Sequence, residues 1–266
     1  MNRDEKIRYL LGAEHYGTED LRLLVELLRS EGGCPWDREQ THQSIRAGLI
    51  EETYEVVEAI DKDDPSLMCE ELGDLLLQVI FHTQIETEGG NFTLGDVTDN
   101  VCRKLIHRHP HVFGDLRVGS TDEVLANWDR IKSEEKCRLT ITDKLRAVPA
   151  ALPALMRAVK VGKRASCLDF PDAGAVMDKI HEETDELSAA IASGDTEWID
   201  EELGDLLLTV SSLARKIDID PEAALNRATD KFIDRFERVE NKARQAGLDI
   251  NKTKMTELDK IWNKIK

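Results

Sequence analysis

Residues 70–77 read EELGDLLL, and residues 201–208 repeat the same eight letters 131 positions later. A second acidic block precedes each copy, with EETYE at residues 51–55 and EETDE at residues 182–186. These blocks are also 131 positions apart, so the two motifs keep the same order and separation in both halves. We interpret this pattern as a tandem duplication of one domain.

Two further segments repeat downstream of the acidic blocks. KLIHR at residues 104–108 matches KFIDR at residues 231–235. WDRIK at residues 128–132 matches WNKIK at residues 262–266. The duplication therefore extends well beyond the octapeptide, with insertions between the repeated segments.

Hydrophobic periodicity is helical along the chain and strand signals are weak, which predicts an all-α protein. We expect two tandem helical-bundle domains, at residues 1–138 and 139–266, related by internal duplication. The segment GGCPWD at residues 32–37 is expected to form a compact loop. Helices are expected at about residues 19–29, 42–61, 66–88, 94–107, 121–137, 151–166, 173–192, 196–216, 221–247 and 254–265.

The composition excludes several classes of protein. The 266 residues are 41% hydrophobic and carry a net charge of −17, so we expect no nucleic-acid partner, which would require a basic face. The N-terminus has no sustained apolar segment, so no signal peptide is expected, and no apolar stretch is long enough for a membrane span. The five cysteines include no CxxC pair, which favours reduced thiols in a cytoplasmic protein.

The acidic blocks place carboxylates on shared helix faces. Residues three apart lie on one face, and two antiparallel helices would bring two such pairs together. The residues concerned are Glu52, Glu55, Glu71 and Asp74 in the first half, and Glu183, Glu186, Glu202 and Asp205 in the second. Clustered carboxylates repel one another unless a cation neutralises them, and oxygen ligands favour Mg²⁺, with Mn²⁺ as a possible substitute. A single such motif is usually a solvated acidic face, but its paired recurrence favours a metal site.

The residues between the carboxylates predict packing. Leu72, Leu75, Leu76 and Val79 and their counterparts Leu203, Leu206, Leu207 and Val210 are expected to supply core contacts. Gly73 and Gly204 are each costly inside a helix, by about 1 kcal/mol relative to alanine. Their position beside the carboxylates predicts close approach of a ligand or of another helix.

Basic residues follow both acidic blocks. Lys231 and Arg235 are four residues apart on one helix face, as are Lys104 and Arg108. Such a pair suits a polyphosphate, although ordinary surface charge is the alternative. Lys179 is a further candidate phosphate contact.

Several other side chains remain open to two interpretations. Trp128 and Trp262 suit either base stacking or core packing. His107, His109 and His111 alternate around Pro110, and no histidine or cysteine is spaced to complete a transition-metal site. We therefore favour a structural or substrate-proximal loop there.

Four segments together resemble the MazG family of all-α nucleoside triphosphate pyrophosphohydrolases in its two-domain form. They are GGCPWDREQTH at residues 32–42, GLIEETYEVVEAID at 48–61, EELGDLLLQVIFH at 70–82 and HRHPHVFGD at 107–115. The similarity covers nearly the whole chain and keeps the order of the segments.

The resemblance implies hydrolysis of NTPs and dNTPs to a monophosphate and pyrophosphate, with Mg²⁺ required. It also implies a homodimer and a role in controlling the nucleotide pool. The eight carboxylates above would be the metal ligands. The implied nucleotide contacts are Lys179, Glu182, the stretch from Trp198 to Glu201, Lys231, Arg235 and Trp262.

The expected mechanism centres on the second half. Glu183 and Glu202 would act in catalysis, and Glu182 or Glu51 would accept the proton of the attacking water as general base. Lys231 and Arg235 would neutralise the departing pyrophosphate. We expect the second half to be the main catalyst because it has Lys179 where the first half has Gly48.

Two alternatives remain at the level of sequence. One is a non-catalytic helical protein that binds metal or nucleotide and regulates a partner. The other is a pyrimidine-selective dUTPase or dCTPase of the same helical superfamily.

Overall fold

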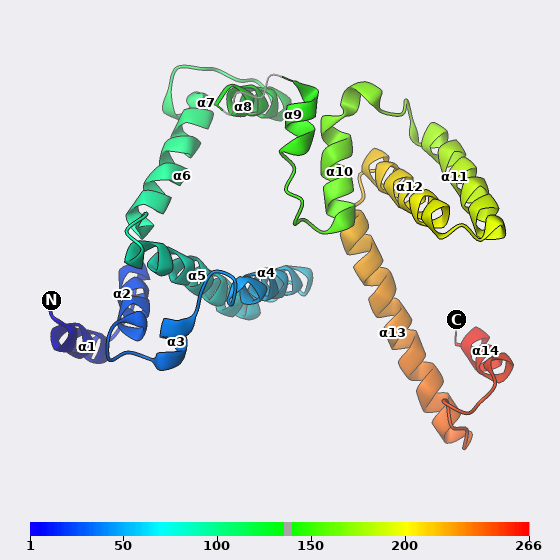
Figure 1. The fold of residues 1–266 in the computed structure, drawn as a ribbon, viewed down its shortest axis with the longest axis horizontal. Coiled ribbons are helices and arrows are strands. Elements are labelled where there is room, and N and C mark those ends of the chain that lie inside the picture. Colours follow the sequence, from blue (N-terminus) through cyan, green and yellow to red (C-terminus); the bar gives the residue numbers. More distant parts are fainter. Residues whose placement is uncertain (136–139, 266) are drawn as a thin grey trace. The chain divides into compact units, whose positions relative to one another are not determined.

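The computed structural model describes residues 1–135 and 140–265, which are helical and contain no strand (Figure 1). The first unit contains α1 (Arg3–Gly12), α2 (Thr18–Arg29), α3 (Pro35–Glu39), α4 (Arg46–Asp61), α5 (Pro65–Glu88), α6 (Leu94–Arg108), α7 (Pro110–Phe113) and most of α8 (Thr121–Glu135). The second contains α9 (Ile141–Arg146), α10 (Ala154–Arg164), the 3₁₀ turn η1 (Ser166–Leu168), α11 (Ala173–Ser193), α12 (Thr196–Lys216), α13 (Pro221–Gln245) and α14 (Met255–Asn263). The all-α prediction is confirmed.

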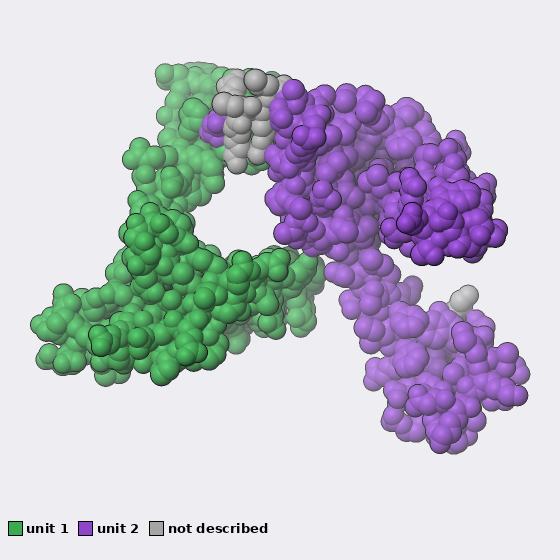
Figure 2. Space-filling model, in the orientation of Figure 1, with its two compact units in different colours: residues 1–132 green, residues 133–266 purple. Residues whose placement is uncertain are grey.

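The chain divides into two compact units, residues 1–132 and 133–266 (Figure 2). Within the first, α4 packs on α5, α5 on α2, and α5 on α6. Within the second, α11 packs on α12, α12 on α10, and α12 on α13. The same packing order in both units supports the duplication. The boundary expected after residue 138 falls at residues 136–139, outside the described residues, and stays a prediction.

Four short helices were not expected from the sequence. One of them, α1, begins with a capping box in which Asn2 and Glu5 each accept a hydrogen bond from the other's backbone N–H. Another, α3, has Pro35 at its first position, where a missing N–H costs nothing, so the loop expected at residues 32–37 is partly helical. Pro110 ends α6 and begins α7, which places His109 at the break. Residues 136–137 of the helix expected at 121–137 lie outside the described residues.

The core of the first unit lies between α2 and α5. Val25, Ile80 and Phe81 are buried there, with Leu21 and Leu77 packed against them. In the second unit the buried apolar side chains include Val176, Ala190 and Ala214. In both units the helices that carry the carboxylates contribute buried residues to the core and also leave apolar side chains exposed.

Six of the eight apolar residues expected to supply core contacts beside the carboxylates are exposed, which corrects the sequence-based expectation, whereas Leu75 and Leu206 are half-buried. Leu72, Leu76 and Val79 of α5, with Leu203, Leu207 and Val210 of α12, are 38% to 49% exposed. We call these two sets the apolar stripes. The reason is that α5 and α12 are apolar on more sides than their neighbours cover, namely α2 and α4 in the first unit and α10 and α11 in the second.

The glycines of the repeated octapeptide have space around them. A methyl group added to Gly73 or Gly204 would meet no described atom within 4 Å outside its own helix backbone. No other helix of the described chain approaches these glycines, and the alternative, close approach of a ligand, stays a prediction.

Two further sequence-based points concern the class of protein. No helix in the described part of the chain is long and apolar enough to cross a bilayer. Cys34, Cys69, Cys102 and Cys167 have free thiols, and Cys137 lies outside the described residues.

Candidate active site

Three carboxylates of the second unit meet across the α11–α12 pair. Glu183 and Glu186 of α11 and Glu202 of α12 each offer an oxygen, and these atoms all lie within 4.8 Å of one another. The turn between the helices produces this arrangement. Gly194 adopts a left-handed conformation at the end of α11, and the Asp195 side chain then caps α12.

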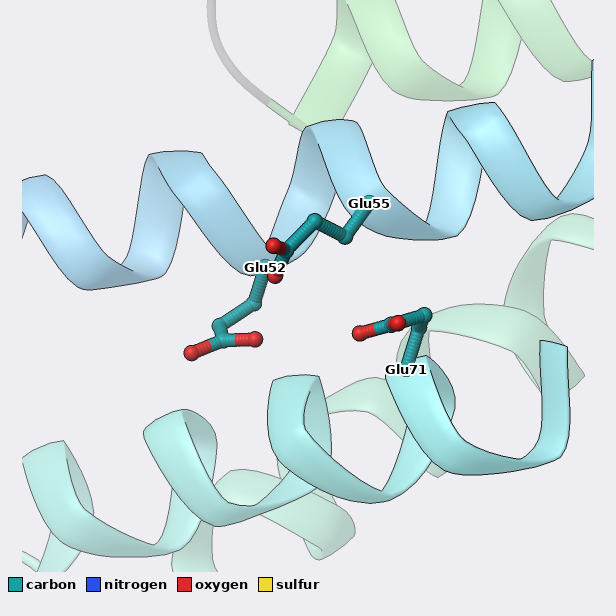
Figure 3. Close-up of side chains that lie close together, drawn as sticks. All are labelled: Glu52, Glu55 and Glu71. Carbon is teal, nitrogen blue, oxygen red and sulfur yellow. The ribbon is translucent and has the colours of Figure 1, made fainter. Parts of the chain in front are cut away.

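The first unit repeats this geometry across α4 and α5. Glu52 and Glu55 of α4 and Glu71 of α5 bring oxygens within the same 4.8 Å limit. Figure 3 shows these three carboxylates facing one another across the space between the helices. Asp64 caps α5 by accepting hydrogen bonds from backbone N–H groups, and Pro65 follows at the first helical position.

Desolvation, together with crowding by neighbouring carboxylates, raises the pKa of several of these carboxyl groups. Desolvation and a hydrogen bond shared with Glu55 raise the pKa of Glu52. Desolvation and the charge of Glu55 raise the pKa of Glu71. Desolvation and the charge of Glu202 raise the pKa of Glu186. Each of the three groups is therefore harder to ionise than in water, which is the condition that a bound cation relieves.

The fourth predicted carboxylate of each set lies farther out. Asp74 and Asp205 are exposed and do not belong to the close groups of three. The charge of Asp74 nevertheless raises the pKa of both Glu52 and Glu71. Asp74 is thus electrostatically part of the first cluster, although its oxygens are not among the closest.

A lysine partly offsets the negative charge of the second cluster. The Lys179 Nζ atom lies 2.8 Å from a carboxylate oxygen of Glu182 and 2.8 Å from one of Glu183. These two carboxylates raise the pKa of Lys179. Glu183 is only 4% exposed, so its ion pair with Lys179 lies where the packed helices meet the solvent.

An amide occupies the corresponding place in the first cluster. Gly48 aligns with Lys179, and a Cβ atom at Gly48 would lie 3.1 Å from the Gln78 side-chain nitrogen. A hydrogen bond from Gln78 partly offsets the rise in the pKa of Glu52. Sequence reasoning missed Gln78, although Thr209 at the matching position of the repeat marked a difference there.

The remaining acidic candidates differ in their surroundings. The Trp198 indole Nε1–H donates to a Glu202 oxygen at 2.7 Å, which ties this predicted nucleotide contact to a cluster carboxylate. Glu51, Glu182 and Glu201 are exposed on α4, α11 and α12.

The predicted basic residues pair with tryptophans in both units. The Arg235 guanidinium lies 4.0 Å from the centre of the Trp262 ring and donates to the Trp262 carbonyl oxygen at 2.7 Å. Arg108 lies 5.6 Å from the centre of the Trp128 ring. The two repeated sequence segments thus form the same type of contact.

The predicted basic residues differ in their exposure, and within the described part of the chain those of α13 do not pair with the acidic cluster of the second unit. Lys104 and Lys231 are exposed, whereas Arg108 is buried. Among the described residues, neither Lys231 nor Arg235 forms an ion pair with a carboxylate of α11 or α12. Arg238, which sequence reasoning missed, lines a cavity with both of them. Its spacing of seven from Lys231 was the available signal.

Comparison with known proteins identifies the family. The profile of the MazG nucleotide pyrophosphohydrolase domain matches residues 40–113 and 173–240, once in each unit. The chain belongs to the MazG nucleotide pyrophosphohydrolase family. Both matched segments contain the full set of cluster glutamates.

Whole-length relatives agree with this assignment. The chain is 42% identical over 250 residues to the nucleoside triphosphate pyrophosphohydrolase/pyrophosphatase MazG of Thermotoga maritima, covering 93% of this chain and 95% of that protein. It is 40% identical over 250 residues to the nucleoside triphosphate pyrophosphohydrolase of Escherichia coli strain K12, covering 92% and 95%. A Mycobacterium tuberculosis protein of the same name is 37% identical over 219 residues, covering 82% and 56%.

Proposed function

We propose that the chain hydrolyses nucleoside triphosphates and deoxynucleoside triphosphates to the monophosphate and pyrophosphate, mainly at the second cluster. The observation that carries the proposal is the close group formed by Glu183, Glu186 and Glu202, within a family of nucleotide pyrophosphohydrolases. Relatives that the chain covers almost end to end are named for this activity.

The donor set fits a hard divalent cation. Each cluster offers only carboxylate oxygens, and its crowded charges favour a cation. Oxygen ligands of this kind select Mg²⁺, with Mn²⁺ as a possible substitute. When bound, such an ion supplies Lewis-acid polarisation of a phosphoryl oxygen and a more acidic water. Glu183, Glu186 and Glu202 would hold it, with Asp205 one turn farther along α12.

The chain's own residues would then position the substrate and move a proton. Lys179 is held between Glu182 and Glu183, so it can turn to a phosphate once a cation neutralises the carboxylates. Release from Lys179 would leave Glu182 free to accept a proton from water. Lys231 and Arg235 would neutralise the departing pyrophosphate, and Trp262 would stack on the base.

A homodimer is part of the proposal. The apolar stripes leave leucine and valine side chains exposed at matching positions of both units, and a second copy of the chain would cover them. We place the protein in the cytoplasm, where it would control the nucleotide pool. Mass measurement in solution tests the dimer.

Product analysis tests the activity. The purified protein is incubated with a panel of NTPs and dNTPs, with Mg²⁺ and with EDTA, and the products are separated. We expect monophosphate and pyrophosphate only in the presence of Mg²⁺. Diphosphate and phosphate as products would refute the proposed bond cleavage, and absence of turnover on the whole panel would refute the enzyme.

A further inference from the structure

A cationic cavity lies on α13 of the second unit. Its volume is about 370 Å³, and Lys231, Asp234, Arg235, Arg238 and Ile265 line it. The lining contains three cationic side chains and one carboxylate, so its net charge is positive. The chain as a whole, in contrast, carries a net charge of −17. A local excess of positive charge in an acidic protein favours a bound anion.

The three cations form one row along the helix. Lys231, Arg235 and Arg238 follow the spacing i, i+4 and i+7, which keeps them on one face. At 1.5 Å of rise per residue, the row extends over about 10 Å, which is comparable to an extended triphosphate. Lys231 and Arg238 are exposed and form no ion pair within the described residues. The Arg235 Nε atom is buried and has no hydrogen-bond partner.

The aromatic contacts give the row a direction. The Trp262 ring lies 5.3 Å from the Phe232 ring and 4.0 Å from the Arg235 guanidinium. A base stacked on Trp262 would therefore place the nucleoside end of the substrate near Phe232, at the Lys231 end of the row, and the phosphates would extend past Arg235. Arg238 lies almost one helical turn beyond Arg235, toward the far end of the phosphate chain.

We propose that Arg238 binds the terminal phosphate of the nucleotide and makes the site prefer triphosphates over diphosphates. This inference rests on the proposed function, because it places a nucleotide along α13. The role of Arg238 is binding and specificity. Asp234 also lines the cavity, and its negative charge offsets one of the three positive charges. Arg238 is therefore needed if the cavity is to attract an anionic ligand strongly.

The first unit lacks this third position on its helix. In the register that aligns Lys104 with Lys231, Arg238 corresponds to His111. However, α6 ends at Arg108 and Pro110 begins α7, so the row of cations is not continued there. Recognition of a third phosphate by this helix face is therefore a property of the second unit.

Two non-cleavable analogues test the role of Arg238. The α,β-methylene triphosphate and α,β-methylene diphosphate of one nucleoside differ only in the terminal phosphate. Their Kd values are measured by calorimetry in Mg²⁺ on the full chain, as wild type, Arg238→Gln and Arg244→Gln. Arg244 is the control because it lies exposed on the same helix, beside Glu240 and outside the cavity.

The wild-type protein is expected to bind the triphosphate analogue more tightly. Arg238→Gln should weaken the triphosphate analogue about 10- to 100-fold, as for loss of a charged hydrogen bond, and leave the diphosphate unchanged. Equal weakening of both analogues, or no weakening of either, would overturn the assignment. Arg244→Gln should change neither. Because these analogues are not cleaved at the α–β bond, product analysis of the wild type tests the proposed function separately.

Discussion

The two acidic clusters keep the same glutamates but differ in the polar side chain that lies beside them. In the second unit, Lys179 brings a full positive charge to Glu182 and Glu183. In the first, Gly48 leaves the space to the Gln78 amide, which bonds Glu52 without neutralising it. The duplication thus preserved the carboxylates and exchanged their partner. The difference separates holding a cation, for which both units offer the same three glutamates, from binding a polyphosphate, for which the second unit also offers a lysine.

The strongest test of this comparison removes one carboxylate from each unit. Glu202→Gln should lower kcat/KM about 100- to 1,000-fold, since a metal contributes several kcal/mol to such a reaction. Glu71→Gln, the matched change in the first unit, should lower it much less. Steady-state rates of both variants on one NTP provide the measurement. Equal losses would contradict the ranking of the two units.

Exchanging the neutralising partners should move activity between the units. The double variant Lys179→Gly, Thr209→Gln gives the second unit the two residues that the first unit has at these positions. We expect turnover to fall about 10- to 100-fold because the charged contact of Lys179 is lost. The reverse exchange, Gly48→Lys with Gln78→Thr, removes the amide that a side chain at Gly48 would meet at 3.1 Å.

The reverse exchange is best measured in a Glu202→Gln background, where we expect the second unit to be nearly inactive. We expect residual turnover to rise about tenfold, the equivalent of one net charged contact. Gly48→Ala with Gln78→Thr is the matched control, because it frees the space without adding charge. A rise in the control as large as in the exchange would show that space, and not charge, limits the first unit.

A smaller effect concerns the stability of the metal-free protein. The pKa of Glu71 is raised from its ordinary 4.5 by desolvation and by neighbouring carboxylates. The folded state therefore binds this proton more tightly than the unfolded state, so the stabilisation exists below pH 4.5 and is lost as pH rises through the folded pKa. Glu71→Gln should accordingly raise Tm at pH 7.5 in EDTA, and the gain should shrink as pH approaches 4.5.

Magnesium ions provide the control for this stability effect. A cation bound between the carboxylates stabilises the folded state of the wild type, so Mg²⁺ should raise the wild-type Tm more than that of the variant. A Tm difference between wild type and variant that is the same at both pH values would contradict the electrostatic explanation.

The spacing of residues within one helix predicted which carboxylates lie together, but it did not predict contacts between helices. The spacing of Glu52 and Glu55, repeated at Glu183 and Glu186, sufficed to place carboxylates together because helix geometry fixes neighbours three apart. The hydrogen bond from Gln78 to Glu52 joins α5 to α4, so it depends on how far one helix is shifted along the other. Spacing within one helix contains no such information.

The exposure of the apolar stripes could not be predicted from the sequence, for a related reason. Leu72 and Leu76 have the hydrophobic spacing of core residues, and a helix pattern shows which side needs cover but not what supplies it. Within the first unit, α2 packs on the other side of α5 and leaves these residues open. A pattern of this kind therefore cannot distinguish the core of one chain from an interface between two.

The last predicted effect concerns Trp198, which donates a hydrogen bond to Glu202 at 2.7 Å. The first unit has Leu67 at the matching position and no such donor there. Trp198→Phe removes the donor while keeping an aromatic ring, and Mg²⁺ affinity should fall about tenfold, as for other groups that orient a ligand. Calorimetric titration with Mg²⁺ alone measures this. If Trp198 instead acts only by stacking on the base, the variant should keep its Mg²⁺ affinity and show a change only in nucleotide KM.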